Sequence, residues 1–143
     1  MMDSQNAEHP ILSIDYGQAR FGIAATDDLG LFAHPVETIE LKKYDPIERI
    51  AVLCEQRKVK TLLLGLPLRL SGEEGDAAEA AREVGKKLQD KLPHLPLYFA
   101  DERYSTVSAS EKLRAAGKNA KKQKSIIDQA AAVEILNQWL GWN

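Results

Sequence analysis

A short apolar run at residues 61–66 constrains the fold more than any other part of the sequence. The run reads Thr-Leu-Leu-Leu-Gly-Leu and lies between two segments whose apolar residues recur at helical spacing. An unbroken run of this length is typical of a central strand that is buried on both faces. Helices must cover both faces of such a strand, so the sequence predicts an α/β fold with this segment inside a sheet.

Three short segments before this run have the composition of strands: residues 11–16, 20–26 and 31–39. The connections between them are only a few residues long and contain glycine or aspartate, which favour tight turns. Because strands joined by short turns pair in opposite directions, the sequence predicts an antiparallel meander.

After the meander, the pattern alternates between helix and strand. Asp45-Pro46 is a strong helix start, with aspartate as the N-cap and proline at the first helical position. A second helix, a fifth strand and two final helices are expected at residues 75–91, 95–100, 105–116 and 123–140. This order predicts a mixed five-stranded sheet, with three antiparallel strands and then two parallel ones, and helices on both faces.

The length of 143 residues suits one domain, expected at residues 10–143 behind a flexible N-terminal tail at residues 1–9. The tail lacks the apolar segment of a signal peptide, and no apolar run is long enough to cross a membrane. Cys54, the single cysteine, has helical core spacing and is expected to be a buried small hydrophobe. These features favour a protein of the reducing cytoplasm.

Positive charge is concentrated in residues 111–124. This segment has six lysines or arginines and one glutamate, a net charge of +5, which leaves −7 for the remainder of a chain whose net charge is −2. A basic stretch on an acidic body is typical of a surface that binds phosphates. A solvated loop with lysines at helix ends has the same composition, so the charge alone leaves both interpretations open.

Carboxylates follow two of the predicted strands at the ends where parallel strands gather ligands. Asp15 ends the first strand in otherwise apolar surroundings, and Asp101-Glu102 follow the fifth. Carboxylate oxygens are the ligands that Mg²⁺ and Mn²⁺ prefer. The alternatives are an Asp-x-Gly hairpin turn at Asp15 and a plain surface turn after the fifth strand. Gly22, in the second strand, lets another backbone or a phosphate come close.

Asp128 lies in the first turns of the apolar final helix, among residues that favour a buried face. A carboxylate there is costly unless it is paired or binds a metal. Ser125-x-x-Asp128 is also the pattern of a capping box, which is the structural alternative. The glycine-rich loop at residues 65–75 either presents amides to an anion or simply connects a strand to a helix.

The three histidines, His9, His34 and His94, are each next to a proline and are expected in the tail or in loops. They are far apart in the sequence, and no His-Glu-x-x-His or Cys-x-x-Cys pattern occurs. A zinc site is therefore not expected.

Taken together, these segments resemble the YqgF/RuvX family of Holliday junction resolvase-like nucleases with an RNase H fold. The resemblance covers residues 11–140. Its four motifs occur in order: Asp15-x-Gly17-x-x-Arg20-x-Gly22; Gly65-Leu66-Pro67-Leu68 with Gly72 and Gly75; Asp101-Glu102-Arg103-x-Ser105-Thr106; and Lys124-x-x-x-Asp128-x-x-Ala131.

The resemblance implies an RNase H-like nuclease that uses two divalent ions, Mg²⁺ or Mn²⁺, and trims the 5′ end of the small-subunit ribosomal RNA precursor. Asp15, Glu102 and Asp128 would be its catalytic and metal-binding acids, with Asp101 as a further metal ligand. Nucleic acid, with RNA favoured over DNA, would be bound by Arg20, Arg103, Lys118, Lys121, Lys122 and Lys124. The chain is expected to act as a monomer or a dimer.

This chain departs from the junction resolvases that the family resembles. In those proteins an acid ends the strand after the first helix, whereas here that strand ends Gly65-Leu66-Pro67. The second carboxylate must then come from the neighbouring strand. Three other functions stay open: a Holliday junction resolvase, a non-catalytic nucleic-acid-binding factor in ribosome assembly or transcription, and one half of a sugar-kinase or actin-like ATPase.

Overall fold

The computed structural model describes the chain at residues 6–102 and 120–142, with side chains described at residues 6–102 and 128–142. Five strands and three helices have these bounds: β1 (Ile11–Asp15), β2 (Arg20–Thr26), β3 (Ala33–Glu40), α2 (Pro46–Arg57), β4 (Thr61–Leu66), α3 (Asp76–Lys91), β5 (Leu97–Asp101) and α5 (Ala120–Leu140).

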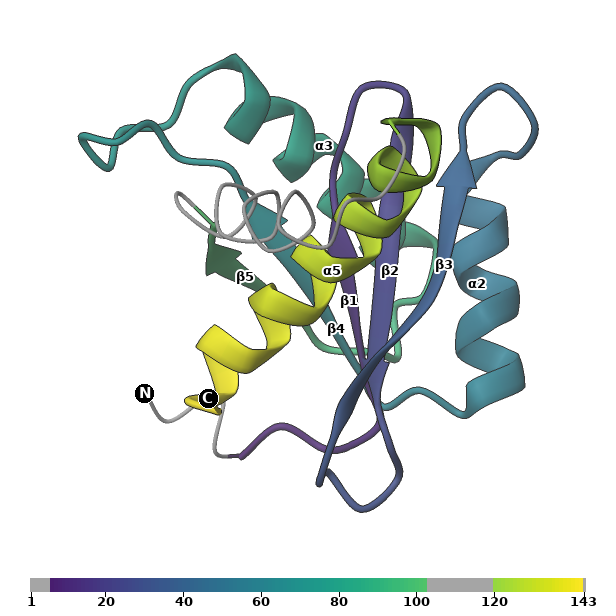
Figure 1. The fold of residues 1–143 in the computed structure, drawn as a ribbon. Helices are drawn as coiled ribbons and strands as arrows, with labels where there is room; N and C mark the ends of the chain where they lie inside the picture. Colours follow the sequence, from purple (N-terminus) through teal and green to yellow (C-terminus); the bar gives the residue numbers. More distant parts are fainter. Residues whose placement is uncertain (1–5, 103–119, 143) are drawn as a thin grey trace.

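The strands form one mixed sheet in the order β3-β2-β1-β4-β5 (Figure 1). β1 pairs antiparallel with β2, and β2 pairs antiparallel with β3. β4 runs parallel to both β1 and β5. This arrangement confirms the predicted mixed five-stranded sheet. All residues of β4 are buried, as its apolar run predicts.

Helices cover both faces of the sheet (Figure 1). On one face, Leu12 and Ile14 of β1 pack in the cluster that contains α2 and residues of α3. On the other face, Ile11 packs with Ala132 and Ile135 of α5. Because neighbouring residues of a strand point to opposite faces, each strand supplies both layers of the core.

The start of α2 follows the sequence prediction. The Asp45 carboxylate accepts hydrogen bonds from the backbone N–H groups of Ile47 and Glu48 at 3.0 and 3.4 Å, and Pro46 fills the first helical position. An N-cap of this kind typically contributes about 1 kcal/mol to helix stability.

α5 packs closely on the centre of the sheet. The buried Ser13 hydroxyl of β1 donates a hydrogen bond to the Ala132 carbonyl at 2.7 Å. A Cβ at Gly22 of β2 would overlap the backbone carbonyl of Asp128. The expectation that Gly22 admits another backbone is therefore met, and the backbone is that of α5.

Several element boundaries differ from the predicted ones. β5 begins at Leu97, two residues after its predicted start at residue 95, and the ends of β1 and β3 and the start of α3 differ by one residue. β3 begins at Ala33 rather than residue 31, because Asp27 Oδ1 accepts a hydrogen bond from the N–H of Leu31 and holds the preceding residues in a turn. α5 begins at Ala120, three residues before its predicted start at residue 123. His34 lies in β3 and not in a loop. The helix predicted at residues 105–116 lies outside the described residues.

Residues 7–9, expected in a flexible tail, contact the body of the protein. The Glu8 carbonyl accepts a hydrogen bond from the Thr61 hydroxyl at 2.8 Å. His9 Nδ1 lies 2.7 Å from Thr26 Oγ1, and the His9 ring stacks on Trp142. Residues 1–5 of the expected tail lie outside the described residues.

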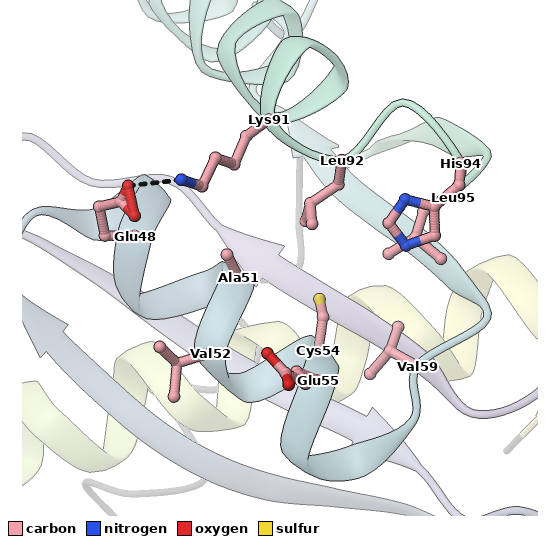
Figure 2. Close-up of a pocket in the computed structure, with 10 residues that line it drawn as sticks. All are labelled: Glu48, Ala51, Val52, Cys54, Glu55, Val59, Lys91, Leu92, His94 and Leu95. Atoms are coloured by element: carbon pink, nitrogen blue, oxygen red, sulfur yellow. Dashed lines mark hydrogen bonds and ion pairs between the residues drawn. The ribbon is translucent and has the colours of Figure 1, made fainter.

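Cys54 is buried in α2, as predicted, and burial raises the pKa of its thiol to about 12. It lies beside a pocket of about 520 Å³ between α2 and the residues that precede β5 (Figure 2). An ion pair between Lys91 and Glu48, 2.7 Å long, spans one end of this pocket. The thiol stays protonated at neutral pH, so it is a packing group and not a nucleophile.

Within residues 6–102 and 120–142, no helix is both long and apolar enough to span a lipid bilayer.

The close contact at Gly22 predicts a large effect of a small substitution. We expect Gly22→Ser to lower the free energy of unfolding by about 1–3 kcal/mol, because α5 must move away from β2. Gly75→Ser is the matched control, since a Cβ there meets only the flexible Arg69 side chain; its effect should stay below about 0.5 kcal/mol. Urea denaturation of both variants measures the difference, and equal effects would contradict the prediction.

Candidate active site

The alternation of side chains along two strands, β1 and β5, brings carboxylates to one end of the face that α5 covers. Ser13 of β1 bonds to α5, so Asp15, two residues later, points to the same face. Ala100 of β5 packs with α5 residues, so Glu102 also belongs to this face. β1 and β5 are both parallel to β4, and their carboxyl ends therefore lie at the same edge.

Asp15 and Glu102 form a buried carboxyl pair. Their residues are only 8% and 6% exposed, and their side chains are hydrogen-bonded to each other. The N–H of Glu102 donates to the Leu66 carbonyl at 3.3 Å, which continues the β4–β5 pairing one residue past β5 and fixes the position of Glu102.

Burial and like charge raise the pKa of both carboxyl groups. Burial is the main cause for Asp15, whose pKa rises to about 6, with a further contribution from the charge of Asp128. Burial again comes first for Glu102, whose pKa rises to about 10, followed by the charge of Asp15. At neutral pH the two carboxyl groups therefore share a proton, since two adjacent buried charges repel each other.

Gly65 of β4 provides the space for the Glu102 carboxyl group. A Cβ at this position would lie 2.6 Å from Glu102 Oε2 and 2.7 Å from Cδ1 of Ile135 in α5. Any larger residue at Gly65 would displace either the carboxyl group or the helix. The sequence interpretation missed this role, although a glycine inside an apolar strand is a signal for close approach.

Asp128 completes the group from α5. Its Oδ2 lies 2.7 Å from Nε of Arg20, and the side chains of Arg20 and Asp128 are 30% and 23% exposed. The charge of Asp128 acts on Asp15. The structure therefore brings Asp15, Glu102 and Asp128 together at one edge, although they are far apart in the sequence.

One alternative interpretation is wrong. Ser125-x-x-Asp128 is not a capping box, because α5 begins at Ala120 and both residues lie inside the helix. The glycine-rich loop leads into α3, whose first turn contains Asp76 and Glu79. These acids disfavour an anion there, and anion binding by the loop stays a prediction.

Comparison with known proteins identifies the family of the chain. The sequence model of the RuvX family, described as Holliday junction resolvase, matches residues 9–141. The chain belongs to the RuvX family.

A relative from Cutibacterium acnes (strain DSM 16379 / KPA171202) is named "Putative pre-16S rRNA nuclease" and is 40% identical over 129 residues, which cover 90% of this chain and 80% of the relative. A relative of the same name from Rhodococcus opacus (strain B4) is 42% identical over 134 residues, which cover 90% of this chain and 75% of the relative.

A solved structure supports the fold. A chain described as Thermus thermophilus RuvC in complex with Holliday junction substrate superposes with a TM-score of 0.55 at 11% identity, covering 92% of this chain and 93% of the other. This likeness confirms the predicted RNase H-like fold.

Asp101 points away from the carboxyl pair of this RuvX-family chain. It is opposite Leu66 in the β4–β5 register, and Leu66 packs with α3 on the other face of the sheet. Asp101 is exposed, and its charge contributes to the raised pKa of Glu102. Its predicted role as a metal ligand stays a prediction, with Glu102 better placed in the structure.

The predicted nucleic-acid-binding residues are only partly described. Arg20 lies at the carboxylate edge. Lys121, Lys122 and Lys124 belong to the first turns of α5, before Asp128, but their side chains are outside the described part. Arg103 and Lys118 lie outside the described residues altogether.

The carboxyl pair predicts an unusual dependence of stability on pH. Both groups bind protons more tightly in the folded chain than in the unfolded chain, so folding takes up protons. The stability that they contribute is full below about pH 4 and is lost as the pH rises through about 6 and then about 10. Each extra proton bound by the folded state corresponds to a slope of about 1.4 kcal/mol per pH unit.

We therefore expect Glu102→Gln to flatten the loss of stability between about pH 5 and about pH 9 in metal-free buffer. Urea denaturation over this range measures it. Glu79→Gln, which changes an exposed glutamate of α3, should follow the unaltered chain. Parallel curves for Glu102→Gln and the unaltered chain would contradict the assigned protonation.

Proposed function

We propose that this chain is a metal-dependent endonuclease that hydrolyses phosphodiester bonds in nucleic acid and processes the 5′ end of the 16S ribosomal RNA precursor. The observation that carries the proposal is the buried Asp15–Glu102 pair with Asp128 beside it. Ordinary folding does not favour adjacent buried carboxyl groups, so their presence is typical of a functional site. The names of the relatives support the substrate.

The donor set fits a divalent cation. Asp15 and Glu102 offer hard oxygen ligands, and Gly65 leaves room for the Glu102 carboxyl group at this position. A cation there would offset the repulsion that keeps a proton on the carboxyl pair. Among the residues whose side chains are described, no three His, Cys, Asp or Glu side chains form a ready-made metal cage. The ion pair between Asp128 and Arg20 is consistent with this result, because it engages the Asp128 carboxylate.

In this proposal, Asp15 and Glu102 would hold Mg²⁺ or Mn²⁺, with Asp128 as the third acid and Asp101 as a charge close by. A bound pair of divalent ions supplies an activated water and stabilises the leaving oxygen of the phosphodiester. The chain's own residues position these groups. Gly65 and Gly22 let Glu102 and the Asp128 backbone approach, and Arg20 holds the Asp128 carboxylate.

A Holliday junction is the second candidate substrate, because the matching family model carries that description. A junction resolvase cuts symmetric DNA strands, whereas precursor processing cuts one RNA strand. The two substrates can be compared directly with the same protein preparation.

We expect Asp15→Asn to lower Mg²⁺- or Mn²⁺-dependent cleavage of a 5′-extended 16S precursor RNA by more than about 100-fold. This loss exceeds the 10–100-fold that removal of an outer-shell metal partner typically costs. Gel analysis of the end-labelled RNA, with a four-way DNA junction in parallel, measures it.

Asp76→Asn is the matched control for this experiment, because Asp76 is an exposed aspartate at the start of α3. It should cleave like the unaltered chain. Cleavage by Asp15→Asn at the unaltered rate would overturn the nuclease proposal. Salt-sensitive RNA binding without turnover in either metal would favour a non-catalytic binding factor instead.

A further inference from the structure

A second feature lies at the same edge of the sheet, on the side of β3. A pocket of about 470 Å³ opens there, lined by Gln18, Ala19, Arg20, Glu40, Leu41, Lys42 and Lys43. None of the sequence motifs includes Lys42 or Lys43. The pocket combines a concave shape with several cationic side chains, which is the chemistry that phosphate groups require.

Two turns form the pocket and are held together by backbone hydrogen bonds. The N–H of Leu41 donates to the Ala19 carbonyl at 3.1 Å, which joins the β1–β2 turn to the segment after β3. The Glu40 carbonyl accepts from the N–H groups of Lys43 and Tyr44 at 3.0 and 3.1 Å. The lysines therefore stand on a backbone that is held against the β1–β2 turn.

Arg20 connects the pocket to the carboxylates. It lines the pocket, and its Nε lies 2.7 Å from Oδ2 of Asp128. A nucleic acid strand with one phosphodiester at Asp15 and Glu102 would thus have its next phosphates within reach of this pocket.

The charges on the two flanks of the edge differ. The pocket lining contains Arg20, Lys42 and Lys43 against one acid, Glu40. On the other flank, Glu73, Glu74, Asp76 and Glu79 are all exposed, but Arg82 is paired with Glu74 at 2.7 Å and the Arg69 side chain lies against Gly75. In Figure 1 the two segments lie on opposite sides of the same end of the sheet. The β3 flank therefore has the larger excess of positive charge, which attracts a polyanion.

Tyr44 adds an aromatic surface to the basic flank. It follows Lys43 directly and is 55% exposed, whereas large aromatic side chains are usually mostly buried. Exposed aromatic rings beside cationic side chains are the surfaces on which single-stranded nucleic acid stacks its bases. Bases in a duplex are stacked on one another and cannot use such a ring.

We propose that Arg20, Lys42, Lys43 and Tyr44 form a subsite for single-stranded nucleic acid next to the scissile bond. The lysines bind the backbone phosphates and Tyr44 stacks on an unpaired base. The subsite rests on the proposed nuclease function and deepens it, because it selects nucleic acid that is single-stranded next to the scissile bond.

Lys43 is paired with Glu40 at 2.9 Å, but both side chains are largely exposed, so a phosphate can replace this weak surface ion pair.

The test measures binding of fluorescent single-stranded and duplex RNAs of roughly 12 nucleotides to the full chain in metal-free buffer, over a range of salt concentrations. We expect the double variant Lys42→Ala/Lys43→Ala to weaken single-strand binding about 10-fold near 0.1 M salt. The slope of log K against log salt should fall by about 1.4, because each lost phosphate contact on a single strand removes about 0.7.

Tyr44→Ala should weaken single-strand binding by about 5-fold or more, leave the salt slope unchanged and leave duplex binding unchanged. The double variant Lys86→Ala/Lys87→Ala is the matched control, because it removes two adjacent exposed lysines from α3. It should bind like the unaltered chain.

Equal binding by the Lys42/Lys43 variant and the Lys86/Lys87 variant would overturn the subsite, as would an equal effect of Tyr44→Ala on single strands and duplexes. Neither result bears on cleavage, which Asp15→Asn tests separately. Loss of the nuclease proposal with retained effects at Lys42, Lys43 and Tyr44 would leave a binding surface without catalysis.

Discussion

The close approach of α5 to the sheet is the constraint on which the candidate site depends. Gly22 lets the α5 backbone reach β2 at Asp128, and Gly65 leaves space between Ile135 of α5 and the Glu102 carboxyl group. Side chains at either glycine would separate the layers. Asp128 would then move away from Asp15 and Glu102. The two glycines therefore determine whether three carboxyl groups from distant parts of the chain can act together.

The same packing explains why the site is costly to the folded chain. Asp15 and Glu102 are buried next to each other, with the charges of Asp128 and Asp101 close by, so the folded protein keeps a proton on this pair at neutral pH. A chain selected only for stability would place apolar residues here. The cost makes sense if a cation and a phosphodiester are the usual occupants of this edge.

Much of the fold follows from local patterns. The apolar run of β4 and the Asp45-Pro46 start of α2 were sufficient to predict both elements. Strand burial and helix capping depend on residues that are adjacent in the sequence. The choice between Asp101 and Glu102 could not be made in this way. It depends on which residues of β5 face α5 and on the register that places Leu66 opposite Asp101. Only the assembled sheet determines both. The space at Gly65 likewise depends on a side chain of α5.

Metal binding at the carboxyl pair is the central claim, and a crystal of the full chain soaked in Mn²⁺ tests it most directly. The account predicts anomalous scattering density within coordination distance of Asp15 and Glu102, about 2.1–2.3 Å from their oxygens, with Asp128 turned towards it. Density elsewhere on the surface, with none at this pair in a preparation that cleaves RNA, would contradict it.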